Sequence, residues 1–381
     1  MRKDILQKQT VKGYDMIPVN ELVRGFKLYQ SEYEEKALSV LRSGWYVLGK
    51  EVDSFEEEFA NALGGSCSCA GVDNGLDAIT LGLRACGITK GDEVIVQANG
   101  YIATMLGIMQ CEAKPVFVEP DEYYQLDPAR IEEAITDRTK AVLVTHLYGQ
   151  ATRMQPVLDV CKKHGLDLFE DCAQSHFASY NGVNTGLFGR ASFFSFYPTK
   201  NLGCFGDGGA VVSTDPEVVK NVKILRNYGS DRRYHNIEVG YNMRLDEIQA
   251  GLLRVRLSHM DELLANRRHI ANRYLKEMKN PLIKLPLVAD GCDHTWYQFI
   301  VRANDQDAFI EHMKSCDVAT DISWRTPPYL QPCMKEQFGY KEGDFPVTED
   351  LCAHIVTLPM MEYMEEDEIT KVIEAVNGYK R

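Results

Sequence analysis

The stretch Phe169–Gly209 reads FEDCAQSHFASYNGVNTGLFGRASFFSFYPTKNLGCFGDGG and places an acidic pair and a lysine beside two short apolar runs. Glu170 and Asp171 end the first run, and Lys200 follows the second in a loop rich in glycine. Apolar runs bounded by Gly, Asn and Asp are typical of buried strands. Residues at the carboxyl ends of such strands face the crevice where α/β proteins bind ligands. The stretch therefore predicts an α/β sheet with an acidic residue and a lysine at its ligand-binding edge.

The surrounding segment, from Asp73 to Thr214, alternates helical patterns with further apolar runs. Nearly continuous hydrophobic strands are expected when helices cover both faces of a sheet, so we predict a mostly parallel, doubly wound sheet. The expected strands are Glu93–Gln97, Pro115–Val118, Ala141–Thr145, Asp167–Glu170, Ala191–Phe196 and Ala210–Ser213. The expected helices are Gly75–Cys86, Thr104–Cys111, Pro128–Ile135 and Met154–His164.

The length of 381 residues exceeds the size at which one hydrophobic core usually stops growing, so two domains are expected. We predict an N-terminal amphipathic segment over 1–42, a large α/β domain over 43–260 and a smaller α+β domain over 261–381. Helix Pro216–Arg226, a polar loop and a long helical stretch Leu245–Lys279 lead from one domain to the other. The small domain is expected to contain strand Tyr297–Arg302 and helices Gln306–Ser315, Thr348–His354 and Glu366–Asn377.

Charge and composition exclude several classes of protein. The net charge is −13, and the lysines and arginines are scattered, which disfavours binding to nucleic acid or to anionic membranes. The apolar runs are far too short to span a membrane, and an apolar signal core is absent, so we expect a cytoplasmic protein. The eleven cysteines are odd in number and dispersed, which indicates reduced thiols. Cys67 and Cys69 lack a second pair at zinc-site spacing, so no metal is expected.

A lysine and a carboxylate at one sheet edge suggest pyridoxal phosphate. This cofactor is tethered to a lysine, here Lys200, and becomes an electron sink when a carboxylate keeps its ring nitrogen protonated. Side chains alternate along a strand, so either Glu170 or Asp171 faces the crevice, but not both.

The cofactor also needs a phosphate site, and the segment after Val72 offers one. Asn74 can cap the following helix, which leaves the backbone N–H groups of Gly75 and Leu76 for a phosphate. Ser195 adds a hydroxyl, and Tyr101 follows a strand end from which it can stack on the ring. Taken singly, each residue is more often a cap, a turn or a solvated loop residue. Together they meet separate requirements of one cofactor at strand ends of one sheet.

Five motifs in a fixed order carry a family resemblance. They are VDNGLDA (72–78), EDCAQSH (170–176), SFYPTKNLG (195–203), GDGG (206–209) and GYNMRLDEIQAG (240–251). From about Gly44 onward, the chain resembles the DegT/StrS family of nucleotide-sugar aminotransferases, which have the aspartate-aminotransferase fold (PLP fold type I). The resemblance implies that Lys200 forms the Schiff base, Asp171 pairs with the ring nitrogen and Gln174 contacts the hydroxyl side of the cofactor. It also implies that Gly75, Leu76 and Ser195 hold the phosphate and that Tyr101 stacks on the ring.

The resemblance implies a reaction and an assembly. We expect amine transfer from glutamate to a dTDP-linked 3-keto-6-deoxyhexose, giving the 3-amino sugar. One alternative is C4 amination of a 4-keto-6-deoxyhexose. Another is a catalytically silent binding or regulatory protein, against which the intact Lys200, Asp171 and Ser195 argue. A nicotinamide dehydrogenase is a weaker alternative, because the glycine loop lacks G-x-G-x-x-G spacing. A homodimer with shared sites is expected, in which Asn242 reaches the partner's phosphate rather than only capping the next helix.

An acidic protein that binds a nucleotide diphosphate needs local positive charge. The densest candidate is the loop containing Arg232, Arg233, Tyr234 and His235. In the small domain, the family's usual His-Tyr-Pro stretch before Pro-Pro-His lies near the sugar nucleotide. Here the stretch reads SWRTPPY over 323–329, so Trp324, Arg325 and Tyr329 are further candidates. His176 is also expected near substrate, and Phe177 stands where the family often has glycine, which narrows the space beside it.

Overall fold

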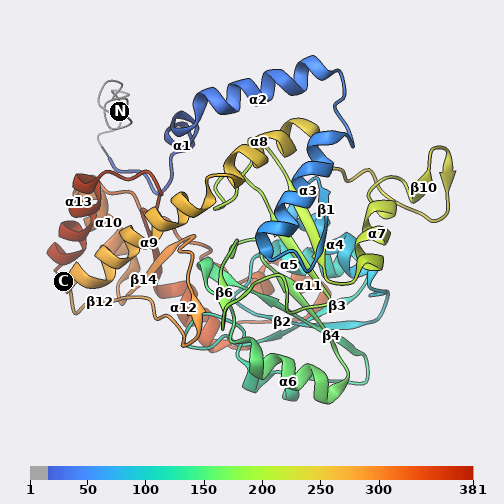
Figure 1. Ribbon diagram of the computed structural model, residues 1–381. Helices are drawn as coiled ribbons and strands as arrows, with labels where there is room; N and C mark the ends of the chain where they lie inside the picture. Colours follow the sequence, from blue (N-terminus) through green and yellow to red (C-terminus); the bar gives the residue numbers. More distant parts are fainter. Residues whose placement is uncertain (1–15, 381) are drawn as a thin grey trace.

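The computed structural model describes residues 16–380, and a seven-stranded sheet forms the centre of the large domain (Figure 1). Its strand order is β1-β9-β8-β5-β4-β2-β3. The strands are β1 (Ser68–Val72), β2 (Glu93–Gln97), β3 (Lys114–Val118), β4 (Thr139–Thr145), β5 (Asp167–Asp171), β8 (Ala191–Ser195) and β9 (Gly209–Ser213). All neighbouring pairs are parallel except those that involve β9, which is antiparallel to both β1 and β8. The predicted mostly parallel sheet is confirmed.

Helices cover both faces of this sheet, as its apolar strands predict. They are α3 (Lys50–Leu63), α4 (Gly75–Ala85), α5 (Ile102–Gln110), α6 (Met154–His164), α7 (Pro216–Leu225) and α8 (Glu247–Leu257). On β2, Val94 and Val96 pack into the core beneath α4 and α5, whereas Ile95 packs on the opposite face beneath α6. This alternation is the period of two of a strand that is buried on both sides.

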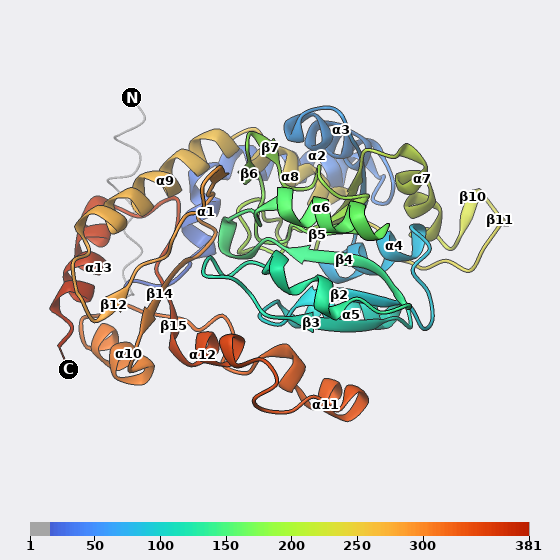
Figure 2. The same cartoon turned by 90° about the horizontal axis from the view of Figure 1, so that it is seen from below.

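The C-terminal part of the chain builds a second, smaller layer beside the large domain (Figure 2). A three-stranded antiparallel sheet in the order β12-β14-β15 lies against helices and has its own apolar core. Its strands are β12 (Ile283–Lys284), β14 (Phe299–Ala303) and β15 (Ile355–Leu358), and its helices are α9 (Met260–Glu277), α10 (Gln306–Ser315), α12 (Pro346–His354) and α13 (Glu366–Gly378). Helix α11 (Pro332–Phe338) packs instead through Met334 on the core of the large domain. Strand β13 (Cys292–Asp293) pairs instead with the short hairpin β6 (Ser179–Tyr180) and β7 (Val183–Asn184) of the large domain.

Several expected elements differ from the structure. The predicted helix Pro128–Ile135 forms two separate 3-10 turns, at Pro128–Arg130 and Glu132–Ala134, because so short a stretch does not sustain helix nucleation without further packing. The predicted continuous helix Leu245–Lys279 is broken into α8 and α9 at Ser258 and His259. Strands β1 and β15 were not predicted from the sequence, since each is short and obtains its hydrogen bonds from a distant strand.

The predicted N-terminal segment contains α1 (Leu22–Leu28) and α2 (Gln30–Ser43), and its first 15 residues lie outside the described residues. Helix α2 packs against α8 along the top of the large domain in Figure 1. Between residues 16 and 380, none of the helices combines the length and the apolarity that crossing a membrane requires.

Candidate functional site

The parallel direction of β1, β2, β4, β5 and β8 gathers their carboxyl ends at one edge of the sheet. Asp171 ends β5, and Ser195 ends β8 and is followed by the Lys200 loop. Gly75 and Leu76 begin α4 just after β1, and Tyr101 precedes α5 after β2. Residues that are up to 125 positions apart in the sequence therefore share one edge, as the sequence predicts.

Asp171 is a buried carboxylate with fixed partners. Its Oδ2 accepts a hydrogen bond from Thr104 Oγ1 at 2.6 Å, and its Oδ1 accepts one from the Ala173 N–H at 3.1 Å. Burial raises the pKa of Asp171, although these hydrogen bonds and the charge of Lys200 oppose the rise. A cationic ring nitrogen supplies the kind of partner that such a desolvated carboxylate lacks.

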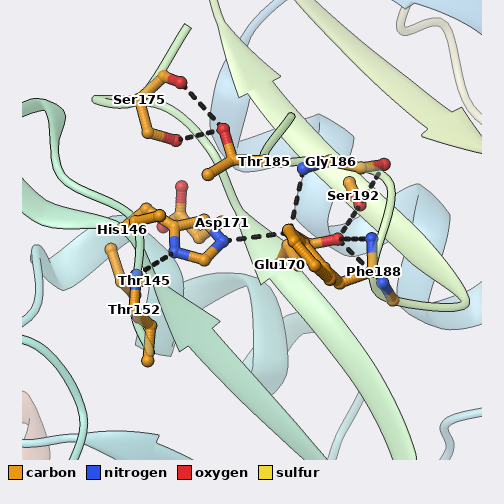
Figure 3. Close-up of polar contacts among 12 residues, drawn as sticks. Thr145, His146, Thr152, Glu170, Asp171, Ser175, Thr185, Gly186, Phe188 and Ser192 are labelled. Carbon is orange, nitrogen blue, oxygen red and sulfur yellow. Dashed lines mark hydrogen bonds and ion pairs between the residues drawn. The ribbon is translucent and has the colours of Figure 1, made fainter. Parts of the chain in front are cut away.

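Glu170 points to the other side of β5 and is fully engaged there (Figure 3). Its carboxylate accepts hydrogen bonds from the N–H groups of Gly186, Phe188 and Gly189, each at 2.8 Å, and from Ser192 Oγ at 3.1 Å. His146 Nε2 lies 3.0 Å from its Oε2. Glu170 therefore shapes the loop before β8, and the choice that the sequence left open falls on Asp171.

The ring of His146 has both nitrogens occupied. Its Nδ1 accepts a hydrogen bond from the Thr152 N–H at 3.0 Å, so the proton stands on Nε2 and is donated to Glu170. His146, Glu170 and Cys172 bring possible metal-ligand atoms within 4.8 Å of one another. The ring nitrogens of His146 and the carboxylate oxygens of Glu170 already take part in hydrogen bonds. We therefore interpret this group as a structural support of β5 rather than as a metal site.

We expect Glu170→Gln to destabilise the protein by roughly 2–4 kcal/mol, because its amide NH₂ would face N–H donors in a buried position. The hydrogen bonds hold the pKa of Glu170 below its ordinary value despite full burial, which by itself raises it. Its stabilisation is thus present above the ordinary glutamate pKa and is lost as the pH falls through the folded-state value. Thermal unfolding midpoints measure the effect, with the exposed Glu57→Gln on α3 as the control. Equal midpoints for the two variants would contradict this account.

The start of α4 forms a cradle for an anion. Asn74 caps the helix through its Oδ1, which accepts the Asp77 N–H at 2.9 Å. The N–H groups of Gly75 and Leu76 precede this bond and are the natural donors to a phosphate. A Cβ atom on Gly75 would lie 2.6 Å from Ser195 Cβ and 3.1 Å from its Oγ, so only glycine lets the helix start approach Ser195. The structure thus brings Gly75, Leu76 and Ser195 together as predicted from the sequence.

Lys200 contacts the small domain, and Gln174 is held within the large domain. Lys200 Nζ lies 4.5 Å from the ring centroid of Tyr297, which precedes β14. Gln174 is buried, and its Oε1 accepts the Tyr148 N–H at 2.8 Å. The charge of Lys200 lowers the pKa of both Tyr297 and His176, after the larger effect of burial on each. Lys200 is therefore close to several of the groups that the sequence singles out.

Trp324 brings the small domain to the same edge. Its Nε1 donates to the Asn99 carbonyl at 3.2 Å, and its ring lies 5.6 Å from that of Tyr101, between centroids. Tyr101 keeps about half of its surface exposed beside it. Trp324 therefore lies beside Tyr101 at the carboxyl edge of the large-domain sheet.

Other predicted substrate residues have different surroundings. Tyr329 is fully buried among Phe117, Tyr340 and Phe345, and its hydroxyl donates to Glu349 at 2.6 Å. It has no exposed surface for a sugar, so its role is packing. Arg325 forms an ion pair with Asp307 of α10 at 2.9 Å, on the outside of the small domain.

His176 is also fully buried, against Phe194 and Phe196, and neither ring nitrogen has a hydrogen-bond partner among the described residues. Burial and, next, the charge of Lys200 lower the pKa of His176 to about 3, so the ring is neutral. The burial leaves no surface for a direct substrate contact. The next residue, Phe177, has a φ of 60°, a left-handed conformation that favours glycine.

The loop that the sequence predicts to bind the nucleotide diphosphate is an exposed hairpin. Strands β10 (Ser230–Arg232) and β11 (His235–Asn236) project away from the body of the protein in both views (Figures 1 and 2). Arg232, Arg233, Tyr234 and His235 therefore lie outside the site of their own chain. Asn242 is exposed at the base of the hairpin, where it bridges to Asn227, and it does not cap α8, whose N-cap residue is Asp246.

Sequence reasoning missed three residues of this region: Thr104, His146 and Tyr297. His146 directly follows the predicted strand Ala141–Thr145, so its place at a strand end was a usable signal. Thr104 and Tyr297 gave no such signal, because only the packing of α5 and of the small domain brings them to the site.

Comparisons with known proteins identify the family of this chain. A model of the DegT/DnrJ/EryC1/StrS aminotransferase family matches residues 28–377. The chain is 46% identical to the dTDP-3-amino-3,6-dideoxy-alpha-D-galactopyranose transaminase of Aneurinibacillus thermoaerophilus, over 96% of this chain and 99% of that protein. It is 40% identical to the dTDP-3-amino-3,4,6-trideoxy-alpha-D-glucose transaminase of Streptomyces venezuelae, over 95% of this chain and 96% of that protein.

Among solved structures, the X-ray structure of S. venezuelae DesV in complex with a ketimine intermediate matches with a TM-score of 0.91. The identity is 40%, and the match covers 95% of this chain and 98% of that one. The expected PLP fold type I is thereby confirmed, and the chain belongs to the DegT/DnrJ/EryC1/StrS aminotransferase family.

Proposed function

We propose that this protein is a pyridoxal-phosphate-dependent aminotransferase that converts a dTDP-linked 3-keto-6-deoxyhexose to the 3-amino sugar, with glutamate as amino donor. The observation that carries the proposal is the meeting of Lys200, the buried Asp171 and the Gly75–Ser195 cradle at one sheet edge. These residues fit the amine, ring-nitrogen and phosphate requirements of the cofactor. When bound, pyridoxal phosphate supplies an electron sink for the carbon that exchanges its amine.

Each residue has a separate task in this proposal. Asp171, desolvated and held by Thr104, keeps a proton on the ring nitrogen by its negative charge. Lys200 would hold the cofactor through its amine and would move the proton at the reacting carbon. Gly75, Leu76 and Ser195 would hold the phosphate, while Tyr101 would stack on the ring and Gln174 would contact its hydroxyl side.

The sugar class rests on the relatives. Both of the transaminases compared above carry dTDP-3-amino sugars in their names, which favours the C3 reaction over C4 amination. Trp324, which reaches from the small domain to Tyr101, is our candidate for the residue that selects the hexose. All eleven cysteines are free thiols in the structure, which supports action in the reducing cytoplasm.

We test the reaction by incubating the purified protein with glutamate and a panel of 3-keto and 4-keto dTDP-sugars, followed by structure determination of the products. A 3-amino product supports the proposal, and a 4-amino product would replace it by the C4 alternative. A protein that binds the cofactor and yet aminates no sugar would support the silent, regulatory alternative.

We also propose that the active unit is a homodimer with shared sites. The hairpin β10–β11 carries Tyr234 at 88% exposed and, just after it, Val239 at 91%. Together with the exposed Tyr228 and Ile237, they gather large apolar side chains on one projecting hairpin, and such clusters are typical of subunit contacts. In such a dimer, Arg232, Arg233, Tyr234 and His235 would contact the nucleotide diphosphate of the partner's site, and Asn242 its cofactor phosphate.

Mixing two inactive variants tests this sharing. Lys200→Ala removes the reacting amine, and Asn242→Asp places a negative charge against the partner's phosphate. A heterodimer of the two has one fully native site, so an equal mixture should regain about a quarter of wild-type activity once subunits exchange. The control is each variant exchanged with itself. No recovery despite proven subunit exchange would show that the sites are not shared.

A further inference from the structure

A tyrosine of the small domain faces the amine of Lys200. Lys200 Nζ lies 4.5 Å from the ring centroid of Tyr297, within the range of a cation–π contact. The hydroxyl of Tyr297 lies 3.5 Å from that of Thr199, the residue before the lysine. Tyr297 therefore contacts both the amine of Lys200 and the side chain of the preceding residue, Thr199.

The position of Tyr297 is fixed by its backbone. Gly149 lies beneath it so closely that a Cβ atom there would come within 2.6 Å of the Tyr297 N. Arg267 Nη1 donates to the Tyr297 carbonyl at 3.3 Å and to the Trp296 carbonyl at 3.0 Å. The buried Glu362 accepts from Arg267 Nη2 at 2.5 Å, which holds the guanidinium in place. The ring is therefore a rigid surface, and the lysine is the flexible partner.

Charges around the pair agree with this contact. Burial by itself raises the pKa of Tyr297. The charge of the Lys200 ammonium, hydrogen bonding of the hydroxyl with Thr199 and Lys200, and the Arg267 guanidinium outweigh burial, so the pKa lies below its ordinary value. Asp171 and His176 are the other titratable groups on which the charge of Lys200 acts. Asp171 is bonded to Thr104, and His176 is a neutral ring. Tyr297 differs from Asp171 and His176 because its aromatic ring is in contact with Lys200 Nζ.

We propose that Tyr297 is a positioning residue, whose aromatic face holds the protonated amine of Lys200 whenever the lysine is not covalently bound to the cofactor. After a lysine has removed a proton from a carbon, and before it returns one, its side chain is an ammonium. Although the stem is flexible, the ammonium must stay close to that carbon. The ring face offers that ammonium a fixed place without a carboxylate that would capture the proton. The contact between Tyr297 and Lys200 is present in the chain without any cofactor. Its effect on catalysis rests on the proposed function.

The direct test follows the titration of the Tyr297 phenol in the cofactor-free, full-length protein. Tyrosines are labelled with ¹³C, and the Tyr297 resonance is assigned by its loss in Tyr297→Phe. In Lys200→Met, which keeps the length of the stem and removes the charge, the titration midpoint should rise by roughly one pH unit. Arg267 is retained in this variant, so a rise in the midpoint reports the loss of the Lys200 charge alone. An unchanged midpoint would overturn the proposal. This result does not depend on cofactor binding, so it is separable from failure of the proposed function.

A kinetic test separates the ring face from the hydroxyl. Tyr297→Phe keeps the face and should stay within about twofold of wild-type kcat, whereas Tyr297→Met and Tyr297→Leu should lose roughly five- to thirtyfold in kcat with little change in KM. The control is Tyr123→Met, which removes a tyrosine stacked on Arg153 elsewhere on the surface. Wild-type kcat in a folded variant without the ring, or a loss in Tyr297→Phe as large as that in Tyr297→Met, would overturn the role of the face.

Discussion

Lys200→Ala should abolish turnover while leaving the protein folded. We expect a loss of at least about 10³-fold in kcat, because one substitution removes both the covalent link to the cofactor and the group that moves the proton. Lys200 is only partly buried in a loop, so the loss of its packing should cost little stability. Single-turnover and steady-state rates, together with the absorbance of the covalently bound cofactor, measure the effect.

The matched control for this variant is Lys220→Ala. Lys220 is an exposed lysine on α7 that pairs with Glu217 of the same helix. It should retain wild-type turnover and absorbance. A Lys200→Ala protein that turns over at the wild-type rate would show that the amine at the sheet edge is not the reacting one.

Asp171→Asn should give a folded protein that binds the cofactor and turns over roughly a hundredfold or more slowly. An amide keeps the shape of the side chain, and its oxygen can still accept the Ala173 N–H, while the Thr104 hydroxyl can rotate to accept from the NH₂. The change removes the negative charge that keeps the ring nitrogen protonated, which weakens stabilisation of the transition state by a few kcal/mol.

Asp167→Asn provides the control on the same strand. Asp167 lies at the other end of β5, where it forms an ion pair with Arg190 at 2.7 Å. Its loss should leave kcat unchanged, since it is remote from the sheet edge that carries Asp171. Near-normal turnover of Asp171→Asn with cofactor bound would mean that a different group protonates the ring, and Glu170 is not available for that because its oxygens are engaged by five donors.

The sequence by itself determined six of the seven strands of the large-domain sheet, all except β1, and the residues at its edge. Strand runs such as Glu93–Gln97 and Ala141–Thr145 are local patterns of apolar side chains, and helices such as Met154–His164 carry their own periodicity. Gly75 and Lys200 could be recognised because their neighbours in the chain, a helix cap and a glycine-rich loop, already indicate the chemistry. Where a signal extends over a few consecutive residues, no tertiary contact is needed to interpret it.

The tertiary structure alone decided between Glu170 and Asp171. Alternation along a strand predicts that their side chains point to opposite faces, but it does not predict which face packs against the Gly186–Gly189 loop. It also decided that Tyr329 is a core residue, since the aromatic side chains around it come from segments more than ten residues away in either direction. It placed Tyr297 against Lys200 through Arg267 and Glu362, contacts between positions that are far apart in the chain. Which polar side chain meets which partner depends on how distant elements pack, and that information is absent from any local pattern of residues.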